Sequence, residues 1–587
     1  MTIEQTIQNG LDAQRQGRMG EAIGHYRTAL ELDPGNVDAL NFMSIIAMTA
    51  GEVGSGVSFA LSAAIVQPDW FGSYINIGNA VQQLGHLPEA ITSFRRAIFL
   101  QPRSAEAFIN LSNALCIAGH PSEAADMAVE AILIAPSHAD AHNNFGNALL
   151  ALNSPGEAVE AYQKALALNQ TNDRVWLNMA NAQAAMKNFF AAVDCYRHSI
   201  ALRDDASKHV YLANTLALLH NLPEAEAEYG KALALAPDNG DALNNLGVLL
   251  RDRGRLDQAE AVLRQGLALA PDAADLHWNL ALVLLTLGRY QEGWAEYEWR
   301  WGTPQFAQYV RDYRSAAWTG EPLEGRSILV HLEQGFGDAI EFCRLVPHLA
   351  DQGAQVVLEC RKGLGRLLAT LDERITVVEA GTAKADTPPC DYHVAMMSLP
   401  HRLGLTLDTI PAKIPYLKVP KGAASFADVA GRPGLKVGVV WSGSNTRRDN
   451  STRSFRPDSL SGLPGVSLFS LQVGDASSET AALIATASIT DLSPHLSDFA
   501  DTAAAIEALD LVISADTAVA HLAGALGKPV WILLPAPSSA FLWMTDRTDS
   551  PWYPSVRLFR QTVPGDWSPV MGEIRRALGE MVDSREA

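Results

Sequence analysis

The pattern of apolar and polar positions changes once along the chain, near residue 326. Before that point, short amphipathic stretches recur with helical spacing. After it, short apolar runs alternate with helical stretches. The first pattern predicts α-helical repeats, and the second predicts buried parallel strands connected by helices.

Prolines mark the period of the first part. They recur every 34 residues, at Pro34, Pro68, Pro102 and Pro136, and again at Pro237 and Pro271. Small residues keep this period apart from one 33-residue step, at Ala90, Ala124, Ala158, Ala192, Ala225 and Ala259. Aromatic residues follow several of these by four positions, at Tyr26, Phe94, Tyr162, Tyr196, Tyr229 and Tyr297. Two short helices per unit fit this pattern, which resembles the tetratricopeptide repeat, and nine units fit between about residue 3 and Trp301.

A row of asparagines keeps the same register on the first helix of its unit: Asn76, Asn110, Asn144, Asn178, Asn245 and Asn279. Such carboxamides could hydrogen-bond the backbone of an extended acceptor protein on the concave side of the superhelix. The alternative is that they belong to the repeat consensus and tie neighbouring helices together. A resemblance to animal-type protein O-GlcNAc transferases, which hold substrate through such a ladder, favours peptide binding.

Composition and charge exclude some classes of function and indicate the cellular compartment. A chain of 587 residues is too long for one core, and its net charge of −20 argues against a nucleic-acid partner. The five cysteines are scattered, which suits a reducing compartment. Because neither a signal peptide nor a membrane-spanning run is evident, we expect a cytoplasmic protein without stable membrane insertion.

The expected domains follow from these changes of pattern. Residues 1–301 form the repeat superhelix, 302–325 a connector, 326–420 the first lobe, and 421–587 the second lobe with a C-terminal helix. The last repeat ends in the aromatic segment 294–301, which we expect to dock the repeats onto the next domain. A membrane contact of these aromatic residues is the alternative.

Two α/β lobes are predicted in the second half. We expect strands at 327–331, 355–360, 375–378, 436–441, 467–473, 511–514 and 530–534. We expect helices at 338–352, 364–371, 477–486, 499–509, 517–526 and 570–582. The fold class is therefore an α-solenoid followed by a double Rossmann-like domain of the GT-B type.

The first lobe carries a candidate catalytic carboxylate. Gly335 and Gly337 follow a strand and permit a tight turn, and Asp338 opens a helix at the cleft. A carboxylate at that place could deprotonate an acceptor hydroxyl. A plain N-terminal helix residue is the alternative for Asp338.

The second lobe carries candidate phosphate contacts after its first strand. Ser442 and Gly443 precede a basic loop that contains Arg447, Arg448 and Arg453. Guanidinium groups there suit the phosphates of a sugar nucleotide and would stabilise the departing charge. A solvated basic loop is the alternative.

The segment 511–535 reads as strand, turn, helix and strand. It places Asp516, Thr517 and His521 at the carboxyl edge of the sheet, where ligands bind such folds. A helix-capping Asp516 and a packed His521 are the alternative.

These motifs together resemble the heptosyltransferase family, and the whole chain resembles bacterial proteins that fuse tetratricopeptide repeats to such a domain. The resemblance implies that Asp338 is the catalytic base. It places Gly335, Gly337, Ser442, Gly443, the Arg447–Arg453 loop, Asp516, Thr517 and His521 around the donor. Because the sequence contains no Asp-x-Asp motif, a metal-independent GT-B mechanism fits better than a metal-dependent one.

We therefore expect a cytoplasmic inverting glycosyltransferase that modifies Ser/Thr hydroxyls of a protein held by the repeats. It would need no cofactor or metal beyond a nucleotide-sugar co-substrate. The resemblance implies flagellin as an acceptor and a CMP-linked nonulosonic acid as donor, although the residues specify neither. Two alternatives stay open: a glycan or lipopolysaccharide transferase that uses the repeats to recruit partners, and a repeat adaptor whose transferase domain has decayed.

Overall fold

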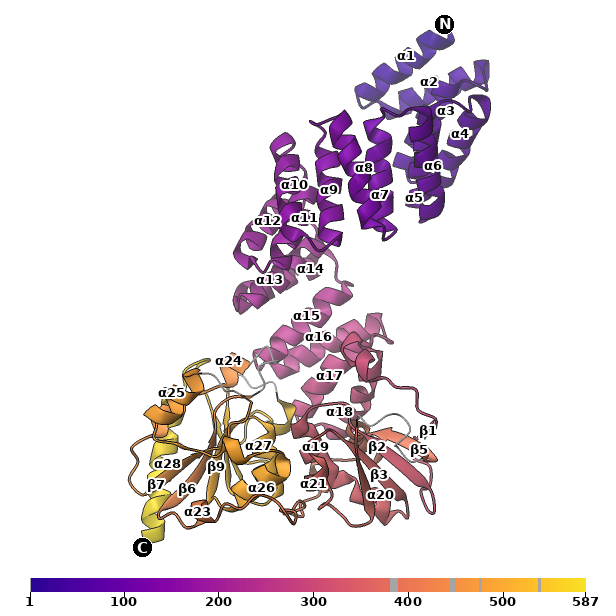
Figure 1. Ribbon diagram of the computed structural model, residues 1–587. Helices are drawn as coiled ribbons and strands as arrows, with labels where there is room; N and C mark the ends of the chain where they lie inside the picture. The colour runs from indigo at the N-terminus through magenta and orange to yellow at the C-terminus, as the bar shows by residue number, and fades with distance from the viewer. Residues whose placement is uncertain (1, 381–388, 444–449, 475–477, 537–539, 587) are drawn as a thin grey trace. The chain divides into compact units, whose positions relative to one another are not determined.

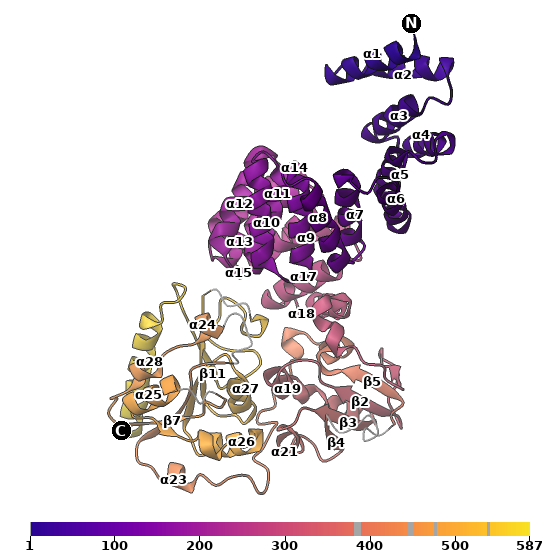
Figure 2. The ribbon, with the colours of Figure 1, turned by 45° about the horizontal axis from the view of Figure 1, so that its top comes forward.

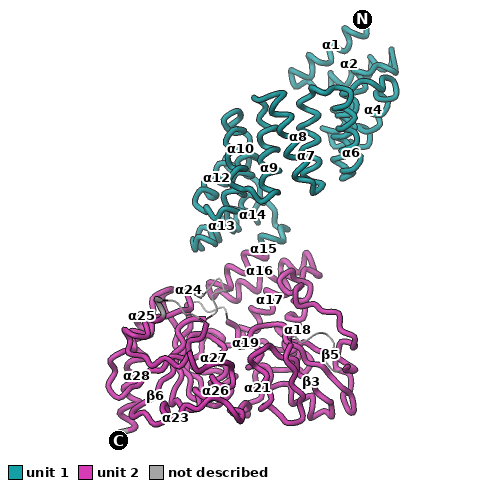
Figure 3. The backbone as a smooth tube through the Cα atoms, in the orientation of Figure 1, with its two compact units in different colours: residues 1–242 teal, residues 243–587 magenta. Residues whose placement is uncertain are grey.

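The computed structural model describes residues 2–380, 389–443, 450–474, 478–536 and 540–586 (Figure 1). Its internal contacts divide the chain into two compact units, Met1–Ala242 and Leu243–Ala587 (Figure 3). The division falls before the last repeats and not at residue 301, where the repeat pattern ends. No helix in the described ranges has the length and apolarity that crossing a membrane would require.

The first unit consists of helices, which pack in consecutive pairs. Their bounds are α1 (Ile3–Arg15), α2 (Met19–Leu32), α3 (Val37–Thr49), α4 (Val53–Val66), α5 (Phe71–Gln83), α6 (Leu87–Leu100), α7 (Ala105–Ile117), α8 (Pro121–Ile134), α9 (Ala139–Ala151), α10 (Pro155–Leu168), α11 (Asp173–Ala185), α12 (Phe189–Leu202), α13 (Ala206–Leu218) and α14 (Leu222–Leu235). The series continues with α15 (Gly240–Asp252), α16 (Leu256–Leu269), α17 (Ala274–Thr286) and α18 (Tyr290–Tyr297). This helix–turn–helix order confirms the predicted solenoid of tetratricopeptide repeats.

A left-handed residue ends the first helix of each repeat. These residues have φ between 57° and 82°, and they are Gly17, Gly51, Gly85, Gly119, Asn153, Lys187, His220, Gly254 and Gly288. The backbone N–H groups that follow donate back to the last turn of the helix, as His86 N–H does to the carbonyl of Val81 at 2.9 Å. The second helix can therefore fold back onto the first.

The small and aromatic positions of the repeat fit together across each helix pair. The six predicted alanines are completely buried. In several repeats an aromatic ring of the second helix packs against a glycine of the first, so that a Cβ atom on Gly146 would lie 2.5 Å from the ring of Tyr162. Gly10 and Gly78 lie against Tyr26 and Phe94 in the same way. The periodic aromatics are therefore packing residues.

The first α/β lobe contains a parallel sheet. Its strands are β1 (Ala316–Ala317), β2 (Ser327–His331), β3 (Gln355–Cys360), β4 (Ile375–Glu379) and β5 (Tyr392–Ala395). Among the described residues they lie in the order β1-β5-β2-β3-β4. The chain reverses its direction of winding between β2 and β5, and ligands bind beyond the carboxyl ends of strands at such a point.

The second lobe contains the other parallel sheet. Its strands are β6 (Leu435–Val440), β7 (Val466–Ser470), β8 (Thr490–Asp491), β9 (Leu511–Ala515), β10 (Val530–Leu534) and β11 (Val556–Arg560). Their order in the described residues, β11-β10-β9-β6-β7-β8, is that of a dinucleotide-binding Rossmann sheet. Its switch point lies between β6 and β9, the strands that precede Ser442 and Asp516. The predicted double Rossmann-like architecture is confirmed.

Except for α28, the helices of the lobes are short. They are α19 (Phe336–Phe342), α20 (Pro347–Asp351), α21 (Gly365–Leu368), α22 (Leu399–Arg402), α23 (Ala427–Ala430), α24 (Asn450–Arg453), α25 (Ser478–Thr486), α26 (Phe499–Glu507), α27 (Ala518–Ala525) and α28 (Ser568–Glu586). The prediction of one helix over 338–352 is wrong, because this segment is divided between α19, a 3-10 turn and α20. Pro347 has no N–H to donate to the carbonyl of Cys343, so the helix is interrupted there.

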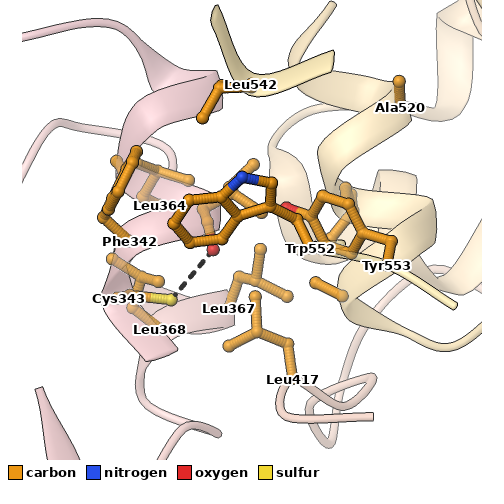
Figure 4. Packing of buried hydrophobic residues seen from close by; sticks show 14 of the residues in the cluster. Phe342, Cys343, Leu364, Leu367, Leu368, Leu417, Ala520, Leu542, Trp552 and Tyr553 are labelled. Carbon is orange, nitrogen blue, oxygen red and sulfur yellow. Dashed lines mark hydrogen bonds between the residues drawn. The ribbon is translucent and has the colours of Figure 1, made fainter. Parts of the chain in front are cut away.

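One hydrophobic cluster joins repeat nine (α17 and α18) to both lobes. It includes Tyr290 and Trp294 from α18, Phe342 from the first lobe, and Trp552 from the second. Figure 4 shows the Trp552 ring between Phe342 on one side and residues of the second lobe on the other; the ring centroids of Phe342 and Trp552 are 5.2 Å apart. The expected docking of the aromatic segment is confirmed for Trp294, which is buried. Trp299, by contrast, stacks on His277 and is 37% exposed.

Two glycines in the first unit test the packing of the repeats. Gly146→Ala places a methyl group against Tyr162, and we expect it to lower the free energy of unfolding by about 1–3 kcal/mol. Gly230→Ala is the matched control, because it lies within α14 with nothing within 4 Å of the added Cβ. We expect this control to raise stability by up to about 1 kcal/mol. Urea denaturation followed by circular dichroism measures both effects, and equal effects of the two substitutions would contradict this packing.

Candidate active site

The candidate catalytic turn lies between β2 and α19. Gly335 is the N-cap residue of α19, and its backbone N–H donates to Oδ2 of Asp338 at 3.0 Å. Gly335 and Phe336 are exposed, and Asp338 is half-buried. The carboxylate is thus fixed in position, yet it keeps contact with solvent. This hydrogen bond is the usual one at a helix N-terminus. The alternative that Asp338 is a plain N-terminal helix residue therefore also fits its geometry.

The two lobes meet at α19 and α27. In both views these helices lie side by side (Figure 1 and Figure 2). Gly337 lies against the second lobe, because a Cβ atom on it would be 3.1 Å from the His521 ring and 3.7 Å from Ala518. An alanine at this position would require the His521 ring to shift by a few tenths of an ångström. The structure therefore brings the Gly335–Asp338 turn and the Asp516–His521 segment together, as expected from their places at strand ends.

Asp516 is held by two groups of its own lobe. Trp543 Nε1 donates to its Oδ1 at 3.0 Å. Arg453 donates to its backbone carbonyl and lies 3.4 Å from its Oδ2. The capping alternative for Asp516 is wrong, because the N-cap residue of α27 is Thr517, whose hydroxyl pairs with Ser514 at 3.0 Å. Asp516 therefore anchors Arg453 and Trp543 at the carboxyl edge of the sheet.

His521 is buried between the lobes, with 5% of its surface exposed. Its Nδ1 lies 3.2 Å from the hydroxyl of Tyr553 and 3.2 Å from Oε2 of Glu341, and its ring stacks on Trp543. Burial lowers the pKa of His521 to about 4, although Asp516 acts in the opposite direction. This burial favours the packed histidine over a direct donor contact.

Glu341 lies one turn after Asp338 on α19 and is completely buried. Burial raises the pKa of its carboxyl group well above the ordinary value; Arg344 opposes this shift, and Asp338 and Asp516 add to it. Burial thus favours the uncharged form of both Glu341 and His521. A proton kept on Glu341 reduces the negative charge at this meeting point of the lobes.

The phosphate loop is only partly described. Ser442 exchanges hydrogen bonds of 3.1 Å with the Gln472 side chain, and its hydroxyl accepts from Ser454 at 3.1 Å. Gly443 follows at the carboxyl end of β6 and is half-buried. Arg453 turns inward to Asp516, whereas Arg447 and Arg448 lie outside the described residues. A phosphate role for all three arginines stays a prediction.

The asparagines of the repeats hydrogen-bond across neighbouring units. Four of them donate to the first helix of the preceding repeat: Asn76 to Asn41 Oδ1 (2.9 Å), Asn144 to the Ile109 carbonyl (3.0 Å), Asn178 to Asn143 Oδ1 (3.0 Å) and Asn279 to Asn244 Oδ1 (2.8 Å). Asn110 and Asn245 hold the same register on α7 and α15. The alternative that these residues tie helices together is confirmed for these four, and peptide binding stays a prediction.

The first unit also contains a hollow of about 440 Å³. It is lined by residues of the first helices α3, α5 and α7: Ile45, Met48, Thr49, Asn76, Asn79, Gln82, Gln83 and Glu106. The lining residues of α5 are all carboxamides, whereas α3 contributes two apolar residues and Thr49, and α7 contributes Glu106.

Comparison with known proteins agrees with both parts of the chain. Residues 465–543 match glycosyltransferase family 9 (heptosyltransferase), and residues 7–69, 75–133, 146–187 and 204–272 match tetratricopeptide repeats. The chain fuses tetratricopeptide repeats to a heptosyltransferase-like domain. Protein FlbA of Caulobacter vibrioides is 29% identical over 325 residues, which are 50% of this chain and 53% of that protein. The alignment thus spans about half the length of this relative.

Solved structures are similar to parts of the chain. The APC/C hetero-tetramer Cut9-Hcn1 matches 45% of this chain and 52% of that one, with 16% identity and a TM-score of 0.39. The thermophilic TPR protein TTC0263 of Thermus thermophilus matches 31% and 99%, with 21% identity and a TM-score of 0.29. YrrB, a TPR protein with an unusual peptide-binding site, matches 32% and 96%, with 21% identity and a TM-score of 0.27.

Several residues of the heptosyltransferase-like domain were not predicted from the sequence. Glu341 could have been suspected from its spacing, because residues three apart share a helix face with Asp338. Arg344 donates to the carbonyl of Trp552 at 2.6 Å and to the Tyr416 hydroxyl at 2.9 Å, and so joins the lobes. No local pattern marks Arg344, since its partners lie far away along the chain. No three His, Cys, Asp or Glu side chains form a metal-ligand group in the described ranges; metal independence stays a prediction.

The raised pKa of Glu341 predicts a pH-dependent stability. The folded chain keeps a proton that the unfolded chain releases above about pH 4.3, so Glu341 contributes stability that is lost as pH rises. We expect Glu341→Gln to gain stability over the unmodified chain as pH rises from about 5 to about 8, by at most about 1.4 kcal/mol per pH unit. Urea denaturation at several pH values measures this slope. Exposed Glu580→Gln is the control, and an equal slope in both variants would contradict a raised pKa of Glu341.

Proposed function

We propose that the protein is an inverting, metal-independent glycosyltransferase that transfers a sugar from a nucleotide-sugar to Ser/Thr hydroxyls of an acceptor protein. The observation that carries this proposal is the meeting of α19 and α27 at the carboxyl ends of the two Rossmann-like sheets. It brings the half-buried Asp338 close to the segment that holds Asp516. The match of residues 465–543 to glycosyltransferase family 9 supports it.

Asp338 acts as the general base in this mechanism. Its carboxylate takes the proton of the acceptor hydroxyl while the hydroxyl oxygen attacks the anomeric carbon. The bond between that carbon and the phosphate oxygen breaks from the opposite side, so the configuration inverts, and the nucleotide leaves with the electron pair. The fixed position of Asp338, through Gly335 N–H, suits a base that must meet the hydroxyl in one geometry.

The second lobe receives the donor at the switch point between β6 and β9. Ser442, Gly443 and Thr517 lie at the carboxyl ends of these strands and are half-buried, so they have surface for a ligand. The first N–H groups of α27 and the arginines of the loop, including Arg447 and Arg448, compensate the phosphate charge. A divalent ion is then unnecessary for the departure of the nucleotide.

The repeats bind the acceptor protein as an extended segment. The hollow on α3, α5 and α7 offers Asn79, Gln82 and Gln83 as hydrogen-bonding groups and Ile45 as an apolar contact. A carboxamide both donates and accepts, so it can pair with a peptide backbone regardless of sequence. From the resemblance, we take flagellin as the first acceptor to test and a CMP-linked nonulosonic acid as the first donor.

Substitution of the base tests the catalytic proposal. We expect Asp338→Asn to lower the rate of transfer to flagellin by roughly 10²–10⁴-fold, because the amide cannot accept the proton. Intact-mass spectrometry of flagellin incubated with a CMP-linked nonulosonic acid measures the rate. CMP binding, followed by thermal shift, should be unchanged, which separates the base from the donor site. Full activity of Asp338→Asn would exclude Asp338 as the base.

Substitutions in the hollow test acceptor binding. We expect Asn79→Ala together with Gln83→Ala to raise the KM for flagellin about five-fold or more, since each lost hydrogen bond costs about 1 kcal/mol. The kcat should stay the same, because Asp338 is untouched. Gln163→Ala, on the exposed face of α10, is the control and should leave KM unchanged. An unchanged KM in the double variant would show that the acceptor binds elsewhere.

A further inference from the structure

The guanidinium group of Arg300 is completely buried where repeat nine meets the first lobe. Arg300 belongs to the 3-10 turn Glu298–Gly302 that follows α18. Its Nη2 donates to Oε1 of Glu333 at 3.1 Å and to the hydroxyl of Ser398 at 2.7 Å. Its Nη1 donates to Oε1 of Glu298 at 2.7 Å and to the Tyr297 carbonyl at 3.2 Å. A residue of the repeats thus reaches into the transferase domain.

The groups that Arg300 holds come from the two strands at the switch point of the first sheet. Glu333 follows β2, and Ser398 follows β5. The backbone N–H of Met397 also donates to Glu333 Oε1, at 3.2 Å. Arg300 therefore fixes the chain beyond both strand ends, where a ligand or catalytic loop of such a sheet is expected.

A second contact from repeat nine reaches the next residue of the same segment. The side-chain amide of Gln334 donates to the hydroxyl of Tyr297. Gln334 immediately precedes Gly335, whose N–H fixes the carboxylate of Asp338. Two of the three residues between β2 and the candidate catalytic turn, Glu333 and Gln334, are thus held by repeat nine.

Attachment of the repeats does not explain these polar contacts. Apolar packing through Trp294 and Tyr290 already joins repeat nine to both lobes. Burying an ion pair carries a desolvation cost that its attraction often fails to offset. Arg300 Nε and Glu333 Oε2 are, in addition, buried without a hydrogen-bond partner among the described residues. The polar contacts instead fix the geometry of the segment that leads to Asp338.

We infer that Tyr297 and Arg300 of repeat nine are positioning residues that set the Gly335–Asp338 turn for catalysis. This inference rests on the proposed role of Asp338. It makes the last tetratricopeptide repeat part of the transferase site, in addition to any role in recruiting the acceptor. The repeats then act on turnover through the backbone that carries the base, and donor binding in the second lobe is independent of them.

Two matched tyrosine substitutions test the inference. Tyr297→Phe keeps the buried ring and removes only the hydroxyl that accepts from Gln334. Tyr290→Phe removes the hydroxyl that accepts from Trp552 Nε1 at 2.9 Å, a contact of the same repeat with the second lobe. We expect Tyr297→Phe to speed hydrogen–deuterium exchange of the amides of residues 335–342 at least about five-fold, and Tyr290→Phe to leave that exchange unchanged. Equal exchange in these residues for the unmodified chain and Tyr297→Phe would overturn the inference.

Kinetics supply the second readout. For transfer to flagellin from a CMP-linked nonulosonic acid, we expect Tyr297→Phe to lower kcat about tenfold, since a base displaced by about 1 Å loses its alignment. The affinity for CMP should stay the same, and Tyr290→Phe should keep its kcat. Equal losses of kcat in both variants would show that Tyr297 has only a structural role, and would overturn the inference. If the unmodified chain transfers no sugar, the proposed function fails, while the exchange measurement still decides whether repeat nine holds the turn.

Discussion

The buried contact between repeat nine and the two lobes is the constraint on which the second unit depends. Tyr290 and Trp294 lie in the same hydrophobic cluster as Phe342 of the first lobe and Trp552 of the second. Each lobe has its own sheet, but this part of the hydrophobic core is shared by both lobes and repeat nine. The relative position of the lobes, and with it the meeting of α19 and α27, is therefore set partly by a helix pair that belongs by sequence to the repeats.

Both burial and pairing affect the charged groups at that meeting point. Asp338 is half-buried, Asp516 is held by Trp543 and Arg453, and burial raises the pKa of Glu341 well above its ordinary value. A proton retained by Glu341 lowers the negative charge of this interface. That arrangement suits the proposed site, which has to admit an anionic donor and to keep one carboxylate available as a base.

Sequence patterns predicted most of the fold because repeats and buried strands are local signals. The strands at 327–331, 355–360 and 530–534 agree with the structure residue for residue. β11 lies at the edge of its sheet and was missed because Arg557 and Arg560 interrupt its apolar run. The proximity of the segments that carry Asp338 and Asp516 was predictable, because each segment follows the carboxyl end of a parallel strand. Arg300 and Glu341 could not be predicted in the same way, because their roles arise from contacts between distant segments.

The division of the chain at residue 242 bears on how such proteins can be rearranged. Repeats before this point form a compact unit of their own, whereas α17 and α18 share a core with the lobes. Recombination could therefore exchange the outer repeats for others without disturbing the transferase fold. A chimaera joined at residue 301 would instead expose Phe342 and Trp552 and leave Glu333 buried without its arginine. In this protein, the boundary between the compact units lies within the repeat array.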